Sequence, residues 1–259
     1  MQIGKLGRAA ISPRDRRAPW FARYAANEST LGYTAPPPID DWTGPTSDYT
    51  FLGNDRAGNC TRACYGHIVQ QRCALLGVKC DLQADDVLKA YKDGTGWDGV
   101  PGSGSDRGDT IVNALTQLRK VGFRDGQYKL RGFGRVNHND TLEMRAALHL
   151  FGSVIIGASL PASIGRQGSS WDVSPVGQRQ SDEAPGSAGG HAFILTKHQR
   201  GRWGAMPWIH KTDITYAWDD LYIDEAWFAV DDLWVTQMRH APNGFDLARF
   251  DHDVAAIAA

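Results

Sequence analysis

Three residues of this sequence have the types and spacing that catalysis by a thiol requires: Cys60, Asn54 and His191. Cys60 follows Asn59, a favourable N-cap residue, at the start of a segment that reads as helix up to about Leu76. At a helix N-terminus, free N–H groups and the positive end of the helix dipole favour the thiolate over the thiol. The sequence therefore predicts a nucleophilic cysteine, and a buried structural thiol is the alternative interpretation.

Asn54 lies on the loop before this helix, where its side-chain amide is expected to fold back beside the helix start. With the backbone N–H of Cys60 it would offer two hydrogen-bond donors to an oxyanion. His191 follows Gly189 and Gly190 at the start of a predicted strand, where an imidazole can face a cleft or serve as a structural residue. His67 is assigned to the core, because it lies about 10 Å along the helix from the cysteine.

Caps and hydrophobic periodicity predict the elements that position these residues. Helices are expected over residues 60–76, 82–91, 110–121, 141–151 and 215–222, and strands over 153–157, 189–196, 202–209 and 225–230. Residues 161–190 are interpreted as a long surface loop. Residues 94–108 form a glycine-rich loop that lacks a Gly-Lys-Ser/Thr motif and a preceding strand, so we expect it to admit a substrate backbone rather than a phosphate.

Composition limits the function classes. The chain has 259 residues, is 42% hydrophobic and carries a net charge of -1, so it can bury a full core and is not basic enough to suggest nucleic-acid binding. No apolar run suits a signal peptide or a membrane span, which predicts a protein made in the cytoplasm. The four cysteines are expected to be reduced, and a zinc site is the weaker alternative because no C-x-x-C pair is present. No cofactor is implied.

Both termini look irregular. Residues 1–47 are interpreted as an extended arm with basic Arg14, Arg16 and Arg17 and three consecutive prolines, and residues 238–259 as a loose tail. Such an arm cannot offset its ordering entropy by itself, so partner chains or a groove on the body must hold it if it is ordered. The aromatic residues Trp20, Phe21 and Tyr24 are its expected anchor, with Trp42 at the junction to the body.

The order of motifs resembles the papain-like (C1-like) cysteine peptidase fold, and more narrowly the small C1-peptidase-like proteins of bacteriophages and bacteria. The resemblance rests on residues 52–56 with Gly58-Asn-Cys-Thr61, residues 105–108, 151–154, 171–173 and 184–187, Gly189-Gly-His-Ala192 and residues 224–227. These motifs span residues 48–235. The resemblance implies an α+β, two-lobed domain over residues 48–237, with a helical lobe over 48–135 and an antiparallel β lobe over 136–237.

The resemblance also assigns roles. Cys60 would be the nucleophile, His191 the general base, and Asn54 the oxyanion-hole amide at a position where glutamine is usual. The substrate groove would be lined by Gly102, Gly104, Asp106, Gly108, Trp171 and Gly190.

One part of the family pattern is missing. The asparagine that orients the histidine in this family precedes Ser-Trp-Gly, and the nearest counterpart before Trp203 offers Gly201, so the third triad member is unknown. Two functions therefore stay open. One is a thiol hydrolase of the peptidase or amidase type acting on peptides or amides, free or carried in a phage particle. The other is a catalytically weak or inactive papain-like module that acts as a structural or virion assembly protein, held to its neighbours by residues 1–47.

Overall fold

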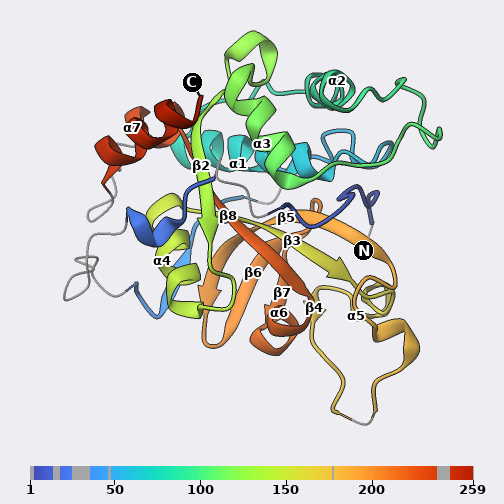
Figure 1. Ribbon diagram of the computed structural model, residues 1–259. Helices are drawn as coiled ribbons and strands as arrows, with labels where there is room; N and C mark the ends of the chain where they lie inside the picture. Colours follow the sequence, from blue (N-terminus) through green and yellow to red (C-terminus); the bar gives the residue numbers. More distant parts are fainter. Residues whose placement is uncertain are drawn as a thin grey trace.

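Helix α1 (Cys60–Leu76) is the centre of the molecule (Figure 1). The protein is described by a computed structural model that covers residues 3–13, 18–24, 36–45, 48–176, 178–237 and 246–258. Every residue of α1 from Cys60 to Cys73 is buried, and the helix ends against Gly77, whose left-handed backbone (φ 67°) no longer fits a helix. The predicted helix is confirmed. Asn59 occupies the N-cap position, but its side-chain amide donates to the Leu52 carbonyl and does not cap the helix.

Two further helices pack beside α1: α2 (Ala84–Thr95) and α3 (Ile111–Lys120). Thr110, expected as the first helical residue, is the N-cap of α3 and accepts a hydrogen bond from the Asn113 N–H. Both arginines of α1 are buried in ion pairs: Arg62 pairs with Asp109 at 2.9 Å, and Arg72 pairs with Asp231. These ion pairs connect α1 to the loop before α3 and to the end of the sheet.

A mostly antiparallel sheet forms the second half of the structure. Its strand order is β2 (Leu130–Val136), β8 (Ile223–Asp231), β3 (Val154–Leu160), β5 (Gly189–Gln199), β6 (Arg202–Met206), β7 (Thr212–Thr215) and β4 (Ser170–Trp171), with β1 (Ile39–Asp41) paired to β5. Side chains alternate between the two faces. On β5, for example, Ala192 and Ile194 face α1, whereas Phe193 and Leu195 face the opposite core.

The opposite face of the sheet is covered by α4 (Thr141–Phe151) and α6 (Tyr216–Tyr222), which enclose an aromatic core. Short elements η4 (Ser181–Glu183), α5 (Ile164–Gln167) and β4 interrupt the segment expected to be one long loop. Two further short helical elements are the 3-10 helix η3 (Arg124–Gly126) and the π-helix η5 (Leu233–Gln237).

The chain termini differ from the expectation of a loose tail. Residues 247–258 form helix α7 (Leu247–Ala258), whose Phe250 is fully buried against Tyr24 (ring centroids 5.2 Å apart) and Phe228 (5.5 Å). The described parts of the N-terminal arm pack against the body, and Phe21 in the short helix η1 (Phe21–Arg23) is completely buried. The predicted anchor is thus found at Phe21 and Tyr24, while Trp20 is 46% exposed. Arg14, Arg16 and Arg17 lie outside the described residues.

Candidate active site

The start of α1 packs against β5, so Cys60 lies beside the residue that follows His191, but the Cys60 thiol and the His191 ring form no hydrogen bond. The backbone N–H of Ala192, the residue after His191, donates to the Cys60 Sγ at 3.4 Å. Cys60 is 1% exposed and His191 is fully buried. All four cysteines are free thiols, as expected.

The His191 ring is held on two sides. Its Nε2 lies 2.7 Å from the Pro207 carbonyl oxygen, and because a carbonyl only accepts, Nε2 carries the proton. The Trp208 ring stacks on the imidazole with centroids 4.5 Å apart. His191 Nδ1 is buried and has no hydrogen-bond partner among the residues that the structure describes. That nitrogen is therefore a free base on the ring.

The orienting group is thus a backbone carbonyl that the sequence did not reveal. The segment around Gly201 and Trp203, which the sequence suggested as the counterpart of the histidine-orienting motif, does not contact His191. Trp203 lies in β6, and its indole N–H donates to Asp219 at 2.7 Å. The usable sequence signal was the Pro207-Trp208 pair just after β6. The proline side chain has no hydrogen-bonding group, so the main-chain carbonyl of Pro207 sets the tautomer of His191.

Asn54 lies where its amide can bind a peptide carbonyl. The side-chain Nδ2 of Asn54 donates to the Lys5 carbonyl at 2.9 Å and to the Ala57 carbonyl at 3.2 Å. The backbone carbonyl of Asn54 accepts from the Lys5 N–H at 2.5 Å. The amide predicted to bind an oxyanion is therefore bound to a carbonyl of the chain's own N-terminal segment.

This segment, residues 3–13, runs across the candidate site as a peptide would. The Gly7 carbonyl accepts from the Asp109 N–H at 2.8 Å, Ala9 N–H donates back to the Asp109 carbonyl at 3.0 Å, and Arg8 N–H donates to the Gly190 carbonyl at 3.2 Å. The Gly7 N–H lies near enough to the Cys60 sulfur to lower the pKa of the thiol. The groove is thus filled by a backbone held through main-chain hydrogen bonds.

Glycines make this close approach possible. A Cβ atom added to Gly7 would lie 1.8 Å from the Gly58 carbonyl oxygen, and one added to Gly108 would lie 2.0 Å from the Gly7 carbonyl oxygen. Gly190 is equally tight, with the Arg8 carbonyl oxygen 2.6 Å from an added Cβ. Two of the predicted groove glycines, Gly108 and Gly190, therefore contact a peptide backbone.

The other predicted groove residues have different surroundings. A Cβ added to Gly102 would reach only the Lys5 Nζ, at 4.0 Å, and Gly104 has open space around it. Trp171 does not line the groove, so that prediction is wrong. It is completely buried in β4, with its ring 5.1 Å from that of Trp218, because an indole offers more stabilisation in the core than beside a peptide groove.

Asp106 supports the loop that carries the nucleophile. Its carboxylate accepts from the Gly58 N–H at 2.9 Å and from the Tyr91 hydroxyl at 2.8 Å. The Tyr91 oxygen in turn accepts from the Gly108 N–H at 2.9 Å. This network ties the glycine-rich loop to the residue two positions before Cys60.

The covered site holds a neutral pair. Burial raises the pKa of the Cys60 thiol to about 11, and the N–H groups of Ala192 and Gly7 lower it only partly. Burial also lowers the pKa of His191 to about 4. The expected preference for thiolate at the helix N-terminus is therefore overturned while the segment is in place, since desolvation outweighs the dipole.

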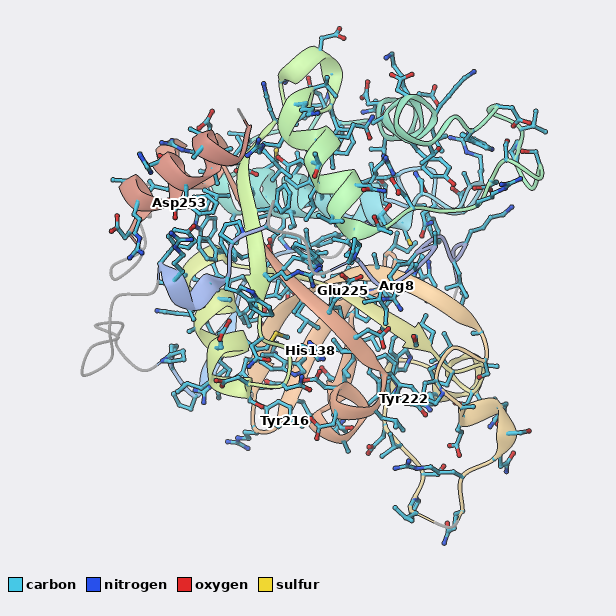
Figure 2. The ribbon with its side chains drawn as sticks, in the orientation of Figure 1. Arg8, His138, Tyr216, Tyr222, Glu225 and Asp253 are labelled. Carbon is cyan, nitrogen blue, oxygen red and sulfur yellow. The ribbon has the colours of Figure 1, made fainter. Side chains whose placement is uncertain are left out.

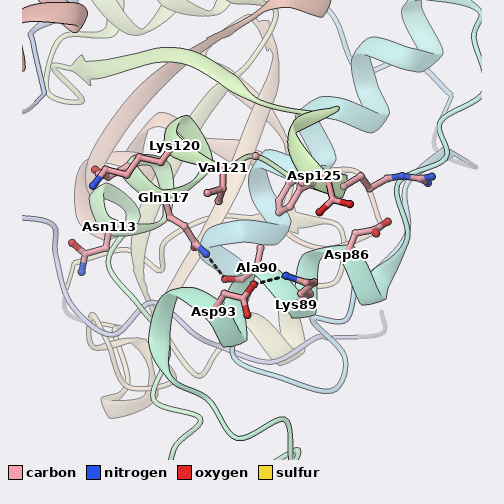
Figure 3. A pocket seen from close by; sticks show the side chains of 13 residues that line it. Asp86, Lys89, Ala90, Asp93, Asn113, Gln117, Lys120, Val121 and Asp125 are labelled. Atoms are coloured by element: carbon pink, nitrogen blue, oxygen red, sulfur yellow. Dashed lines mark hydrogen bonds and ion pairs between the residues drawn. The ribbon is translucent and has the colours of Figure 1, made fainter. Parts of the chain in front are cut away.

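A large open cavity of about 810 Å³ lies away from this site, between α2 and α3 (Figure 3). It is lined by charged and polar side chains such as Lys89, Asp93 and Gln117, and it contains neither Cys60 nor His191.

Within the described ranges, no group of three or more His, Cys, Asp or Glu side chains is placed to hold a metal ion. None of the described helices is long and apolar enough to span a bilayer.

No family model matches the sequence, and no curated protein sequence matches it. Among solved structures the chain is similar to xylellain, a cysteine protease from Xylella fastidiosa, with a TM-score of 0.66 and 16% identity over 88% of this chain and 96% of that one. It is also similar to digestive procathepsin L 3 of Tenebrio molitor larval midgut, with a TM-score of 0.55 and 14% identity over 85% and 76% of the two chains. These similarities show that the chain has the papain-like cysteine protease fold, as the sequence predicts.

Proposed function

We propose that this chain is a thiol hydrolase of the peptidase or amidase type that is latent while residues 3–13 fill its groove. The observation that carries the proposal is the peptide backbone across the Cys60 sulfur. That backbone is held by Gly190, Asp109 and Asn54, so the groove has the hydrogen-bonding groups that an extended peptide substrate needs.

The residues act in a defined order once the groove is open. The Cys60 thiol loses its proton to His191 Nδ1, and the sulfur attacks the substrate carbonyl carbon. The negative charge collects on the carbonyl oxygen, which accepts from the Asn54 amide and the Cys60 N–H. His191 then gives its proton to the leaving amine as the C–N bond breaks. Water, deprotonated by His191, cleaves the resulting thioester and restores the thiol.

Opening the groove also changes the protonation equilibria of Cys60 and His191. When water reaches the site, the desolvation that raises the pKa of Cys60 and lowers that of His191 is removed, and the helix N-terminus again favours thiolate. The Pro207 carbonyl keeps the proton on Nε2 and leaves Nδ1 as the base. Activity therefore depends on displacement of the segment.

The alternative is an inactive papain-like module with a structural or virion assembly role. The buried Cys60 and the filled groove favour it, because a chain that never opens has no route for substrate. Under this alternative the N-terminal segment is a permanent part of the domain.

The single substitution Gly7→Ala separates the two functions in the full-length chain. An added methyl group would collide with the Gly58 backbone, so the segment must leave the groove near Cys60. We expect hydrolysis of a fluorogenic peptide library to rise at least tenfold over the wild-type chain, and Cys60→Ser to abolish it. Gly165→Ala is the matched control, because nothing lies within 4 Å of its added Cβ.

A Gly7→Ala chain that is folded and open to solvent at Cys60, yet cleaves no member of the library, would reject the hydrolase. Hydrolysis by the wild-type chain at the same measurable rate as by Gly7→Ala would reject latency and leave the hydrolase in place.

A further inference from the structure

The guanidinium of Arg8 lies between carboxylates, and Figure 2 shows Arg8 next to Glu225. The charge of Arg8 is close enough to lower the pKa of both Cys60 and His191. Arg8 forms ion pairs with Asp224 and with Glu225, the latter at 3.4 Å, and it donates to the Ser159 hydroxyl at 3.2 Å. Its side chain is only 3% exposed. We call Ser159, Asp224 and Glu225 the Arg8 site.

The Arg8 site is built for a cation. Glu225 is 1% exposed, and its remaining partners are the Trp227 indole N–H at 3.0 Å and the Ser12 N–H at 3.2 Å, neither of which is charged. Among the described cations, Arg8 is the one that pairs with both carboxylates. Without it a buried carboxylate would lack a counter-charge, which proteins rarely tolerate.

The site also has the shape of a side-chain pocket. Ser159 donates to Asp224 at 2.8 Å, which fixes the carboxylate. A Cβ atom at Gly157 would lie 3.0 Å from the Arg8 Cδ and 2.8 Å from the Glu225 Cγ, so the glycine leaves room for a long side chain. Asp224 is 21% exposed, which leaves the site a path to solvent.

The position of the site relates it to the reacting atoms. Arg8 follows Gly7, whose backbone N–H lies near the Cys60 sulfur. The Arg8 N–H donates to the carbonyl of Gly190, the residue before His191, at 3.2 Å. A substrate lying in the same groove would therefore place a side chain in the Arg8 site within one or two residues of its scissile bond.

We propose that the Arg8 site is the specificity site of the enzyme and selects substrates with an arginine next to the scissile bond, a place that Arg8 occupies in the latent chain. This inference rests on the proposed hydrolase function. A fork of two carboxylates and a hydroxyl matches the planar guanidinium better than a lysine ammonium, so arginine is preferred to lysine.

The site is tested first by binding, independently of catalysis. Full-length Arg8→Ala leaves the carboxylates without their cation, and methylguanidinium chloride is added while thermal unfolding is followed. We expect it to raise the melting temperature of Arg8→Ala above the value in methylammonium chloride at equal concentration, and to leave wild type unchanged because Arg8 fills the site. Arg8→Gln, which keeps more of the volume, is used if the alanine variant does not fold.

The second test measures selection by the opened enzyme. Full-length Gly7→Ala is given peptides with arginine, lysine or leucine at successive positions around one cleavable bond. We expect arginine at one position to raise kcat/KM about tenfold or more over leucine, the magnitude of a charged hydrogen-bonded contact. Asp224→Asn should reduce this ratio, whereas Asp220→Asn, a change at an exposed α6 residue, should not.

The two tests fail separately. Stabilisation by methylguanidinium without any peptide hydrolysis would keep the Arg8 site and reject the hydrolase. Hydrolysis with no preference for arginine, or equal effects of methylguanidinium on Arg8→Ala and wild type, would overturn the specificity site and leave the hydrolase standing.

Discussion

At the residue scale, His191 depends on a backbone group for its orientation. The Pro207 carbonyl is neutral and fixed by the chain, so it sets the imidazole tautomer without adding a charge to the site. Trp208 shields that hydrogen bond by stacking on the ring. Local patterns in the sequence single out Cys60, Asn54 and His191 as candidates, but they could not show a main-chain partner for the imidazole, because any residue type can supply a carbonyl.

Asn54 gives a prediction at this scale. In the Gly7→Ala background, Asn54→Ala should lower kcat about 100-fold with a smaller change in KM, because an oxyanion donor acts mainly on the transition state. Asn54→Gln should recover part of the loss, since it retains an amide donor. A steady-state series on one peptide measures this, and an unchanged kcat in Asn54→Ala would remove Asn54 from the oxyanion hole.

At the element scale, the predicted helices and strands follow from local signals. Asp140, a residue type that favours the N-cap position, caps α4 by accepting from the Leu142 and Glu143 N–H groups at 2.9 and 3.1 Å. The sequence did not predict strand β2 and helix α7, because each is stabilised by packing against the other and neither has a strong local signal. Because Gly132 in β2 has no side chain, the Phe250 ring of α7 can pack directly against the strand. A Cβ atom added to Gly132 would lie only 2.5 Å from that ring. Such complementarity joins residues far apart in the chain, and no local pattern reports it.

Helix α7 leads to a stability prediction. Phe250→Ala should lower the free energy of unfolding by about 3 kcal/mol, because it empties a fully buried site shared with Tyr24 and Phe228. Arg249→Ala, one position earlier and exposed, is the control and should change little. Chemical denaturation measures both, and equal midpoints would mean that α7 does not contribute to the folded domain.

At the scale of the whole molecule, the N-terminal segment connects the two halves of the fold. Residues 3–13 contact the glycine-rich loop through Gly108, the sheet through Gly190 and Glu225, and β2 through Arg135, which donates to the Ser12 carbonyl at 2.9 Å. The described residues of this segment make their contacts with the body of the same chain. Composition alone could not decide this, since the contacts are mostly to backbone.

Two buried histidines predict how stability depends on pH. Burial lowers the pKa of both His67 and His191 to about 4, below the value of about 6.5 for an unfolded chain. The unfolded chain therefore binds more protons between these values, and stability falls as the pH drops from about 6.5 to 4, by on the order of 3 kcal/mol for each histidine.

His67→Gln checks this sign. The variant should lose less stability between pH 7 and pH 4.5 than wild type, because one depressed histidine is removed. His210→Gln, at an exposed position, should behave as wild type. Urea unfolding at the two pH values measures the difference, and an equal loss in His67→Gln and wild type would contradict a buried neutral His67.

Site-resolved alkylation of the four cysteines by iodoacetamide, read by mass spectrometry, tests the central claim most directly. In the wild-type chain Cys60 should stay unlabelled, while the partly exposed Cys80, whose pKa is lowered by a hydrogen bond from Cys73, reacts first. In Gly7→Ala, Cys60 should become the fastest thiol near neutral pH, and adding His191→Ala should slow it. Cys60 that remains unreactive in Gly7→Ala, or reacts at the same rate without His191, would contradict a latent Cys60–His191 hydrolase.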